Sequence, residues 1–213
     1  MHLITENLSI ERGGRTIIDG LSFAVADGEA LVLTGPNGAG KTTLIRAVAG
    51  FLAPLSGSVR LDGGMADTPI AEQCHYVGHR DGVKGSLSVA ENARFWGSYL
   101  GGVGAIDGVL ERVGLAALAG VPAAYLSAGQ RRRLGLARLL LAQRPLWLLD
   151  EPTVSLDASG VAMLAGLVAE HLAAGGLVLA ATHIPLGLAR ARELRLGVRL
   201  GGGLASSLAG EEQ

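Results

Sequence analysis

The sequence has very little cysteine, few aromatic side chains and almost no net charge. Cys74 is the only cysteine among 213 residues, so no disulfide can form within the chain, as is typical of proteins in a reducing compartment. Lys and Arg number 18 against 19 Asp and Glu, a formal net charge of −1 that gives no electrostatic footprint for nucleic-acid binding. We therefore expect no nucleic-acid partner.

Long apolar runs are also missing. No run approaches the roughly 20 residues needed to span a bilayer, and the first six residues become polar too early for a signal peptide. The hydrophobic residues, 49% of the chain, are largely Ala, Leu and Val, which suits a tightly packed α/β core. We expect any role at a membrane to be exerted through a partner protein.

Hydrophobic patterns predict alternating strands and helices. Period-two alternation at 21–25 predicts a strand, and the apolar run at 30–34 predicts a strand buried on both faces. Three later strands are predicted at 146–150, 177–182 and 193–200. This alternation predicts a largely parallel sheet, in which ligands bind at the carboxyl ends of the strands.

Helix signals are concentrated in the middle of the chain. Ser88 and Glu91 form a capping box that opens a predicted helix. We interpret Arg131, Arg132 and Arg133 as a solvated helix face, with a place at the nucleotide or partner interface as the alternative. Further helices are predicted at about 41–49, 106–114, 128–143 and 158–174, which makes residues 79–144 mostly helical.

A glycine-rich loop follows the strand at 30–34. Residues 35–42 read GPNGAGKT and fit the G-x-x-x-x-G-K-[ST] pattern, in which glycines let backbone N–H groups converge on phosphate oxygens. Lys41 would reach the β- and γ-phosphates, and the Thr42 hydroxyl would bind Mg²⁺. The alternative is an ordinary strand-to-helix turn. The predicted nucleotide-binding residues of this loop are Gly35, Pro36, Asn37, Gly38, Ala39, Gly40, Lys41, Thr42 and Thr43.

Two carboxylates end the strand at 146–150. Asp150 can orient the metal, usually through water, and Glu151 can polarise an attacking water. The sequence LSAGQ at 126–130 is a second helix N-terminus that can bind an anion, with Ser127 at the cap. Because the loop at 35–42 already serves this chain's own phosphate site, we expect LSAGQ to close over a nucleotide held by another subunit.

These motifs, in this order and over nearly the whole chain, resemble those of the ABC-type ATPases, a class of P-loop NTPases. The resemblance implies one domain, residues 1–213, with a nucleotide-binding core formed by 1–78 and 145–213. That core would hold a mostly parallel sheet and an antiparallel N-terminal β-subdomain. Residues 79–144 would be an inserted α-helical subdomain.

Residue roles also follow from the resemblance. Two subunits of the family enclose two ATP molecules head to tail, so Ser127, Gly129 and Gln130 would contact ATP across the dimer. Residues 155–157, ending at Asp157, would link the two sites. His183 would contact the γ-phosphate and the attacking water, and is predicted to be catalytic with Glu151 and Lys41.

Two positions depart from the family pattern. The aromatic residue that usually stacks on adenine is absent, and Arg12 can stack its planar guanidinium there instead, or be a solvated turn arginine. His79 stands where the family usually has Gln, and we expect it to contact nucleotide-bound water or the sphere of the metal. The predicted metal-site residues are Thr42, Asp150 and His79.

The sequence YVGHRDGVK at 76–84, with LSAGQ and the short length, is similar to the haem-exporter ATPases of cytochrome c maturation. That resemblance implies a peripheral subunit on the cytoplasmic face of the inner membrane. It would pair with a second ABC subunit and with a polytopic permease subunit docked on the helical subdomain, with Phe95 and Trp96 as candidate anchors. We expect no direct haem binding, because Cys74 and His75 alternate on a strand and no C-x-x-C-H is present.

Other functions remain possible from the residues alone. A soluble ABC ATPase of the metallocluster-assembly type would carry the same motifs, as would the subunit of another small ABC transporter. A nucleotide-binding regulator without turnover is a third alternative, which the intact set of Lys41, Asp150, Glu151 and His183 argues against.

Overall fold

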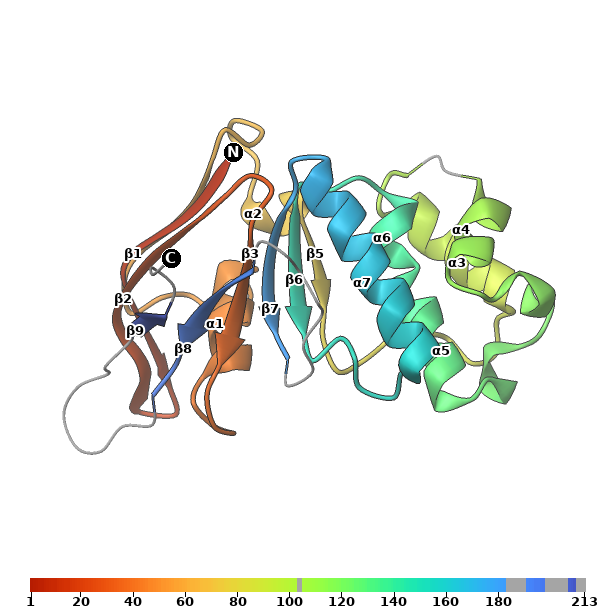
Figure 1. The fold of residues 1–213 in the computed structure, drawn as a ribbon, viewed down its shortest axis with the longest axis horizontal. Helices are drawn as coiled ribbons and strands as arrows, with labels where there is room; N and C mark the ends of the chain where they lie inside the picture. Colours follow the sequence, from red (N-terminus) through yellow and green to blue (C-terminus); the bar gives the residue numbers. More distant parts are fainter. Residues whose placement is uncertain (103–104, 183–190, 198–206, 210–213) are drawn as a thin grey trace.

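Two sheets and a group of helices make up the chain in the computed structural model (Figure 1). The structure describes residues 1–102, 105–182, 191–197 and 207–209. The smaller sheet is antiparallel, with strand order β2-β1-β4. Its strands are β1 (His2–Arg12), β2 (Arg15–Ala26) and β4 (Ser56–Asp62).

The larger sheet is the core of the molecule. Its order is β5-β6-β7-β3-β8-β9, and every neighbouring pair is parallel except β8 with β9. Its strands are β3 (Ala30–Thr34), β5 (Cys74–Val77), β6 (Leu146–Asp150), β7 (Leu177–Ala181), β8 (Ala191–Arg195) and β9 (Ser207–Ala209). The predicted fold class is thus confirmed, with a mostly parallel sheet beside an antiparallel one.

Helices cover both faces of the core sheet. Alternate residues of β6 and β7 pack against α1 on one face and α7 on the other, so both strands are buried along their whole length. A third apolar cluster joins α3, α4 and α5 at the far side of α7 (Figure 1). The helices are α1 (Lys41–Val48), α2 (Ile70–Gln73), α3 (Val89–Tyr99), α4 (Ile106–Arg112), α5 (Ala128–Leu136), α6 (Arg138–Leu141) and α7 (Ala158–Ala173), with short 3₁₀ helices at Ala116–Leu118 and Ala123–Tyr125.

The predicted helix at 128–143 is wrong as a single element. It is divided at Ala137 into α5 and α6. Arg138 Nε donates to the Gly135 carbonyl at 3.0 Å, an oxygen that an unbroken helix would pair with a main-chain N–H four residues on. The side chain therefore competes with the helical hydrogen bond.

The predicted strand at 193–200 is also displaced. The structure places β8 at Ala191–Arg195, and residues 198–200 lie outside the described part. Within the described residues, no helix is both long and apolar enough to cross a membrane.

Candidate nucleotide site

The glycine-rich loop connects β3 to α1 at the carboxyl end of the core sheet. Gly35, Gly38 and Gly40 all have positive φ, at 127°, 82° and 98°. A Cβ on Gly35 would lie 2.2 Å from the carbonyl oxygen of Leu196, so no larger residue fits there. The loop thus depends on glycine both for its turns and for its approach to a neighbouring segment.

Lys41 lies at the start of α1 with its side chain folded back over the loop. Its Nζ donates to the carbonyl oxygens of Gly35 at 2.6 Å and Pro36 at 3.2 Å. The side chain is buried, at 8% exposure. Its positive charge is therefore held at the N-terminal end of a helix, where the loop amides and the helix dipole also favour an anion.

Thr42 and Asp150 meet across 108 positions of sequence. Thr42 Oγ1 donates to Asp150 Oδ1 at 2.9 Å. The carboxylate of Asp150 is 1% exposed, and its Oδ2 has no hydrogen-bond partner among the described residues. A buried carboxylate oxygen without a donor, beside a hydroxyl, fits a cation that completes its shell with phosphate and water oxygens.

Glu151 follows β6 in an unusual backbone conformation. Its φ is 50°, in the left-handed region that a non-glycine residue rarely adopts. Its main-chain N–H donates to the Ala181 carbonyl at 2.8 Å, which ties it to the end of β7. The strand end thereby turns sharply, so that Asp150 and Glu151 line the same pocket.

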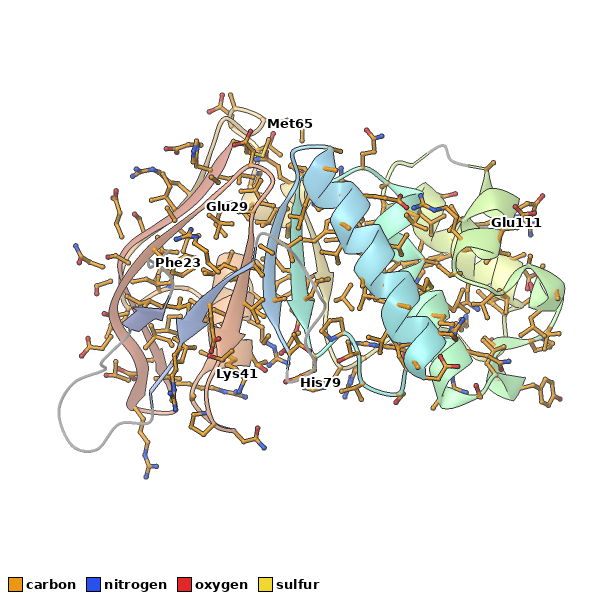
Figure 2. The ribbon with its side chains drawn as sticks, viewed as in Figure 1. Phe23, Glu29, Lys41, Met65, His79 and Glu111 are labelled. Atoms are coloured by element: carbon orange, nitrogen blue, oxygen red, sulfur yellow. The ribbon has the colours of Figure 1, made fainter. Side chains whose placement is uncertain are left out.

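These groups converge on one pocket of about 440 Å³. Lys41 and His79 lie at the same end of the molecule, with Met65 at the other (Figure 2). A second pocket of about 490 Å³ adjoins it and shares Ile17, Gly38 and Ala39. The first pocket is lined by Arg12, Ile17, Asn37, Gly38, Ala39, Gly40, Lys41, Thr42, Thr43, His79, Asp150 and Glu151.

The LSAGQ turn does not join this pocket in the described structure. Ser127 caps α5, accepting from the Gln130 N–H at 3.2 Å, while Gln130 Oε1 accepts from the Ser127 N–H at 2.9 Å. Gly129 packs against Ser155, whose carbonyl would be 2.9 Å from a Cβ there. Gly129 therefore lies beside Ser155, and none of Ser127, Gly129 and Gln130 lines the pocket around the loop at 35–42.

Asp157 begins α7 as its N-cap. Its Oδ1 accepts from the Gly160 N–H at 2.8 Å and from Arg133 Nη2 at 2.6 Å. These hydrogen bonds, that of Gly160 first, lower the pKa of the Asp157 carboxyl. His183, the remaining predicted catalytic residue, lies outside the described residues.

Arg132 corrects the interpretation of the three arginines as a solvated face. It is 4% exposed, and all three of its guanidinium nitrogens are hydrogen-bonded. Sequence reasoning missed it because its hydrogen-bond partners follow β5 and β6 and are distant in the sequence. Two of them, Gly78 and Asp81, lie 54 and 51 positions before Arg132.

Cys74 and His75 are buried on opposite faces of β5, as the alternation predicts. Burial raises the pKa of the Cys74 thiol to about 12. His75 Nε2 donates to the Ala142 carbonyl at 2.8 Å, and burial lowers the pKa of the imidazole to about 4. Both side chains are packed into the structure, and neither lines the pocket.

Comparison with known proteins places these features in a family. Residues 18–154 match the ABC transporter family. The chain is 58% identical to the cytochrome c biogenesis ATP-binding export protein CcmA of Rhodopseudomonas palustris, covering 92% of this chain and 98% of that protein. The protein of the same name from Nitrobacter winogradskyi is 54% identical, with coverage of 92% and 98%. A solved ATP-binding subunit of an ABC transporter, 24% identical, matches the fold with a TM-score of 0.81 over 98% of this chain and 90% of the other.

Proposed function

The chain belongs to the ABC transporter family, and we propose that it binds and hydrolyses ATP as the ATP-binding subunit of a cytochrome c biogenesis exporter. The observation that carries this is the pocket formed by the loop at 35–42, Asp150 and Glu151, in a chain whose relatives bear that name. ATP is the substrate, held by its triphosphate.

The loop at 35–42 binds the phosphates. Its amide groups and the start of α1 offer donors, and Lys41 exchanges its carbonyl partners on Gly35 and Pro36 for phosphate oxygens. Arg12, the last residue of β1, stacks on the adenine. This exchange costs little free energy, because the Lys41 ammonium gives up neutral carbonyl oxygens and gains negatively charged phosphate oxygens.

Thr42 and Asp150 hold the Mg²⁺ that accompanies ATP. Mg²⁺ in such sites takes one or two protein oxygens and completes its shell with phosphates and water, which fits a single hydroxyl beside the unpartnered Asp150 Oδ2. When bound, the ion neutralises charge on the β- and γ-phosphate oxygens. His79, at the rim of the same pocket, contacts water in that shell.

Glu151 activates the attacking water. Its carboxylate accepts a proton from a water molecule in line with the γ-phosphate. As the water oxygen bonds to the γ-phosphorus, the bond from that phosphorus to the bridging oxygen breaks, which gives ADP and inorganic phosphate. His183 contacts the same water and the γ-phosphate. A second subunit contributes Ser127, Gly129 and Gln130 to close the site, with Asp157 at the link between the two sites.

The chain works at the cytoplasmic face of the inner membrane on a polytopic partner. Phe95, 55% exposed on α3, stacks on Tyr99 and stands edge-on to Trp96, which leaves an aromatic surface on the helical region. The partner docks on this region, and ATP hydrolysis drives the export step of c-type cytochrome assembly. Haem is handled by the partner proteins and not by Cys74 or His75.

The test is the Glu151→Gln variant, with Mg-ATP binding and hydrolysis measured separately. We expect hydrolysis to fall about 10²- to 10⁴-fold, the usual contribution of a general base, while ATP affinity is kept. Glu111→Gln, exposed on α4 far from the pocket (Figure 2), is the matched control and should hydrolyse ATP like the wild type. Equal hydrolysis by both variants would contradict the role of Glu151.

The export role is tested in cells that lack the chain. Loss of covalently haem-bound cytochromes, restored by the wild type and not by Glu151→Gln, is the expected result. Normal cytochromes in the deletion strain would favour the soluble ABC ATPase instead.

A further inference from the structure

Arg132 occupies a buried position where α5 meets two strand ends of the core sheet. Its Nε donates to the Pro152 carbonyl at 3.0 Å, and its Nη2 donates to the Glu151 carbonyl at 2.8 Å. Its Nη1 donates to the Gly78 carbonyl at 2.7 Å and to Asp81 Oδ1 at 2.8 Å. One side chain thereby joins the helix that follows the LSAGQ turn to the segments after β5 and after β6.

The first consequence concerns the backbone of Glu151. A left-handed conformation is unfavourable for a non-glycine residue, so it persists only where neighbouring contacts hold it. Both main-chain polar groups of the residue are engaged: its N–H donates to the Ala181 carbonyl, and its carbonyl accepts from Arg132 at 2.8 Å and from the Val154 N–H at 3.3 Å. Because φ sets where the carboxylate points, Arg132 helps to aim the side chain of Glu151 into the pocket.

The second consequence concerns His79. Gly78 precedes it and Asp81 follows two positions later, and Arg132 Nη1 bonds to both. The exposed imidazole of His79 is therefore carried on a segment that is tied down on either side. The backbone of Glu151 and the segment that carries His79 follow different strands, and both are hydrogen-bonded to the same guanidinium.

The third consequence concerns α5. Arg132 lies one helical turn after Ala128, the first residue of the helix that Ser127 caps. Arg132 and the LSAGQ turn thus belong to the same short helix, and the guanidinium of Arg132 ties that helix to the backbone of Glu151. Arg132 does not line the pocket, so it would act on the reaction through these neighbours and not by touching ATP.

We propose that Arg132 is a positioning residue for ATP hydrolysis, which sets Glu151 and His79 relative to the LSAGQ helix. The proposal rests on the proposed ATPase function. A lysine cannot replace this arginine, because one ammonium cannot reach four acceptors that lie in the plane of a guanidinium fork.

The experiment compares Arg132→Lys with the wild type in the full chain, with kcat, KM for ATP and ATP affinity measured separately. We expect kcat to fall about 10- to 100-fold, since small displacements of catalytic groups cost this much, with ATP affinity unchanged. Arg112→Lys is the matched control. Arg112 also joins the helical region to the core, through an exposed ion pair with Glu170, and its variant should keep the wild-type kcat.

A merely structural role is separated by three further measurements. Arg132→Ala leaves Asp81 without its partner in a largely buried site and is expected to lower the melting temperature, whereas Arg132→Lys keeps a positive charge beside Asp81 and should lower it less. Adding Arg132→Lys to Glu151→Gln should lower the residual hydrolysis little further, because both changes act on the same group. Hydrogen exchange of residues 78–81 and 151–153 should quicken in Arg132→Lys.

The outcomes distinguish the two proposals. Wild-type hydrolysis by Arg132→Lys, or an equal further loss when it is added to Glu151→Gln, would overturn the positioning role and leave the ATPase function standing. A wild-type chain that binds no Mg-ATP and hydrolyses none would overturn the ATPase function and this inference with it.

Discussion

Single side chains at the pocket are placed by neighbours that are distant in the sequence. Gly35 meets the Leu196 carbonyl, and Thr42 bonds to Asp150 across 108 positions. Lys41 is the exception, since its partners are in its own loop. The phosphate-binding charge is therefore local, and the metal and water groups come to it through the packing of β6 beside the rest of the sheet.

The role of Arg12 can be measured directly as a change in the affinity for ATP. It is exposed and lines the pocket next to the loop at 35–42. Arg12→Ala removes the planar group that would stack on adenine, so we expect ATP affinity to fall about two- to fivefold. Calorimetric titration of Mg-ATP, in the Glu151→Gln background to prevent turnover, measures this change.

Arg60→Ala is the control for Arg12→Ala. Arg60 is an exposed arginine of the same small sheet, paired with Glu6 and Asp62. Its variant should bind ATP like the parent protein. If Arg12→Ala did the same, Arg12 would be a solvated turn residue.

Among the elements, α3 shows how a helix boundary is set by a few polar contacts. Ser88 Oγ accepts from the Glu91 N–H at 3.2 Å, and the Ser88 N–H donates to Glu91 Oε2 at 2.7 Å. The predicted capping box is confirmed. These hydrogen bonds with Ser88 lower the pKa of the Glu91 carboxyl, so the cap is stable above the usual Glu pKa and weakens as the pH falls through the lower, folded value.

Ser88→Ala removes this cap. We expect the free energy of unfolding to fall by about 1 kcal/mol, the usual cost of losing an N-cap, with ATP affinity unchanged. Urea unfolding followed by circular dichroism measures the shift. Ser98→Ala, exposed near the end of the same helix, is the control and should unfold at or above the wild-type midpoint. A Ser88→Ala midpoint equal to that of the control would contradict the role of the cap.

At the scale of the whole molecule, His75 links the core sheet to the end of the helical region. It is buried on β5 and donates to the Ala142 carbonyl just after α6. Its pKa is lowered from 6.5 to about 4, chiefly by burial. Between these two pKa values the unfolded chain binds a proton at His75 that the folded chain does not. The contribution of the neutral imidazole to the free energy of unfolding is therefore complete above pH 6.5 and is lost as the pH falls toward 4.

His75→Gln keeps a donor for Ala142 and removes the titration. We expect the wild type to lose roughly 2 kcal/mol more than the variant between pH 7.5 and pH 5. Unfolding in urea at both pH values measures the difference. His2→Gln, at an exposed position of β1, should follow the wild type; if His75→Gln did so as well, the buried imidazole would not be the source of the acid sensitivity.

Much of this protein could be predicted from runs of adjacent residues. The glycines and lysine of residues 35–42, the acidic end of β6, the capping box of Ser88 and the N-cap at Ser127 depend on neighbours a few positions apart, so local sequence determines their geometry. Two assignments stay predictions: the boundaries of the helical subdomain at 79 and 144, and the roles of residues across a dimer. They concern the division of the whole chain and a second subunit, which no single helix or strand defines.

Tertiary structure decided what local patterns do not contain. Arg132, between two other arginines on a helix, gives no local sign that it is buried; only the meeting of α5 with the ends of β5 and β6 shows it. The burial of Asp150 beside Thr42, which leaves its Oδ2 without a hydrogen-bond partner among the described residues, is likewise a result of packing. Sequence determines the conformations that depend on covalent neighbours, whereas contacts between distant segments exist only once burial of apolar surface has brought those segments together.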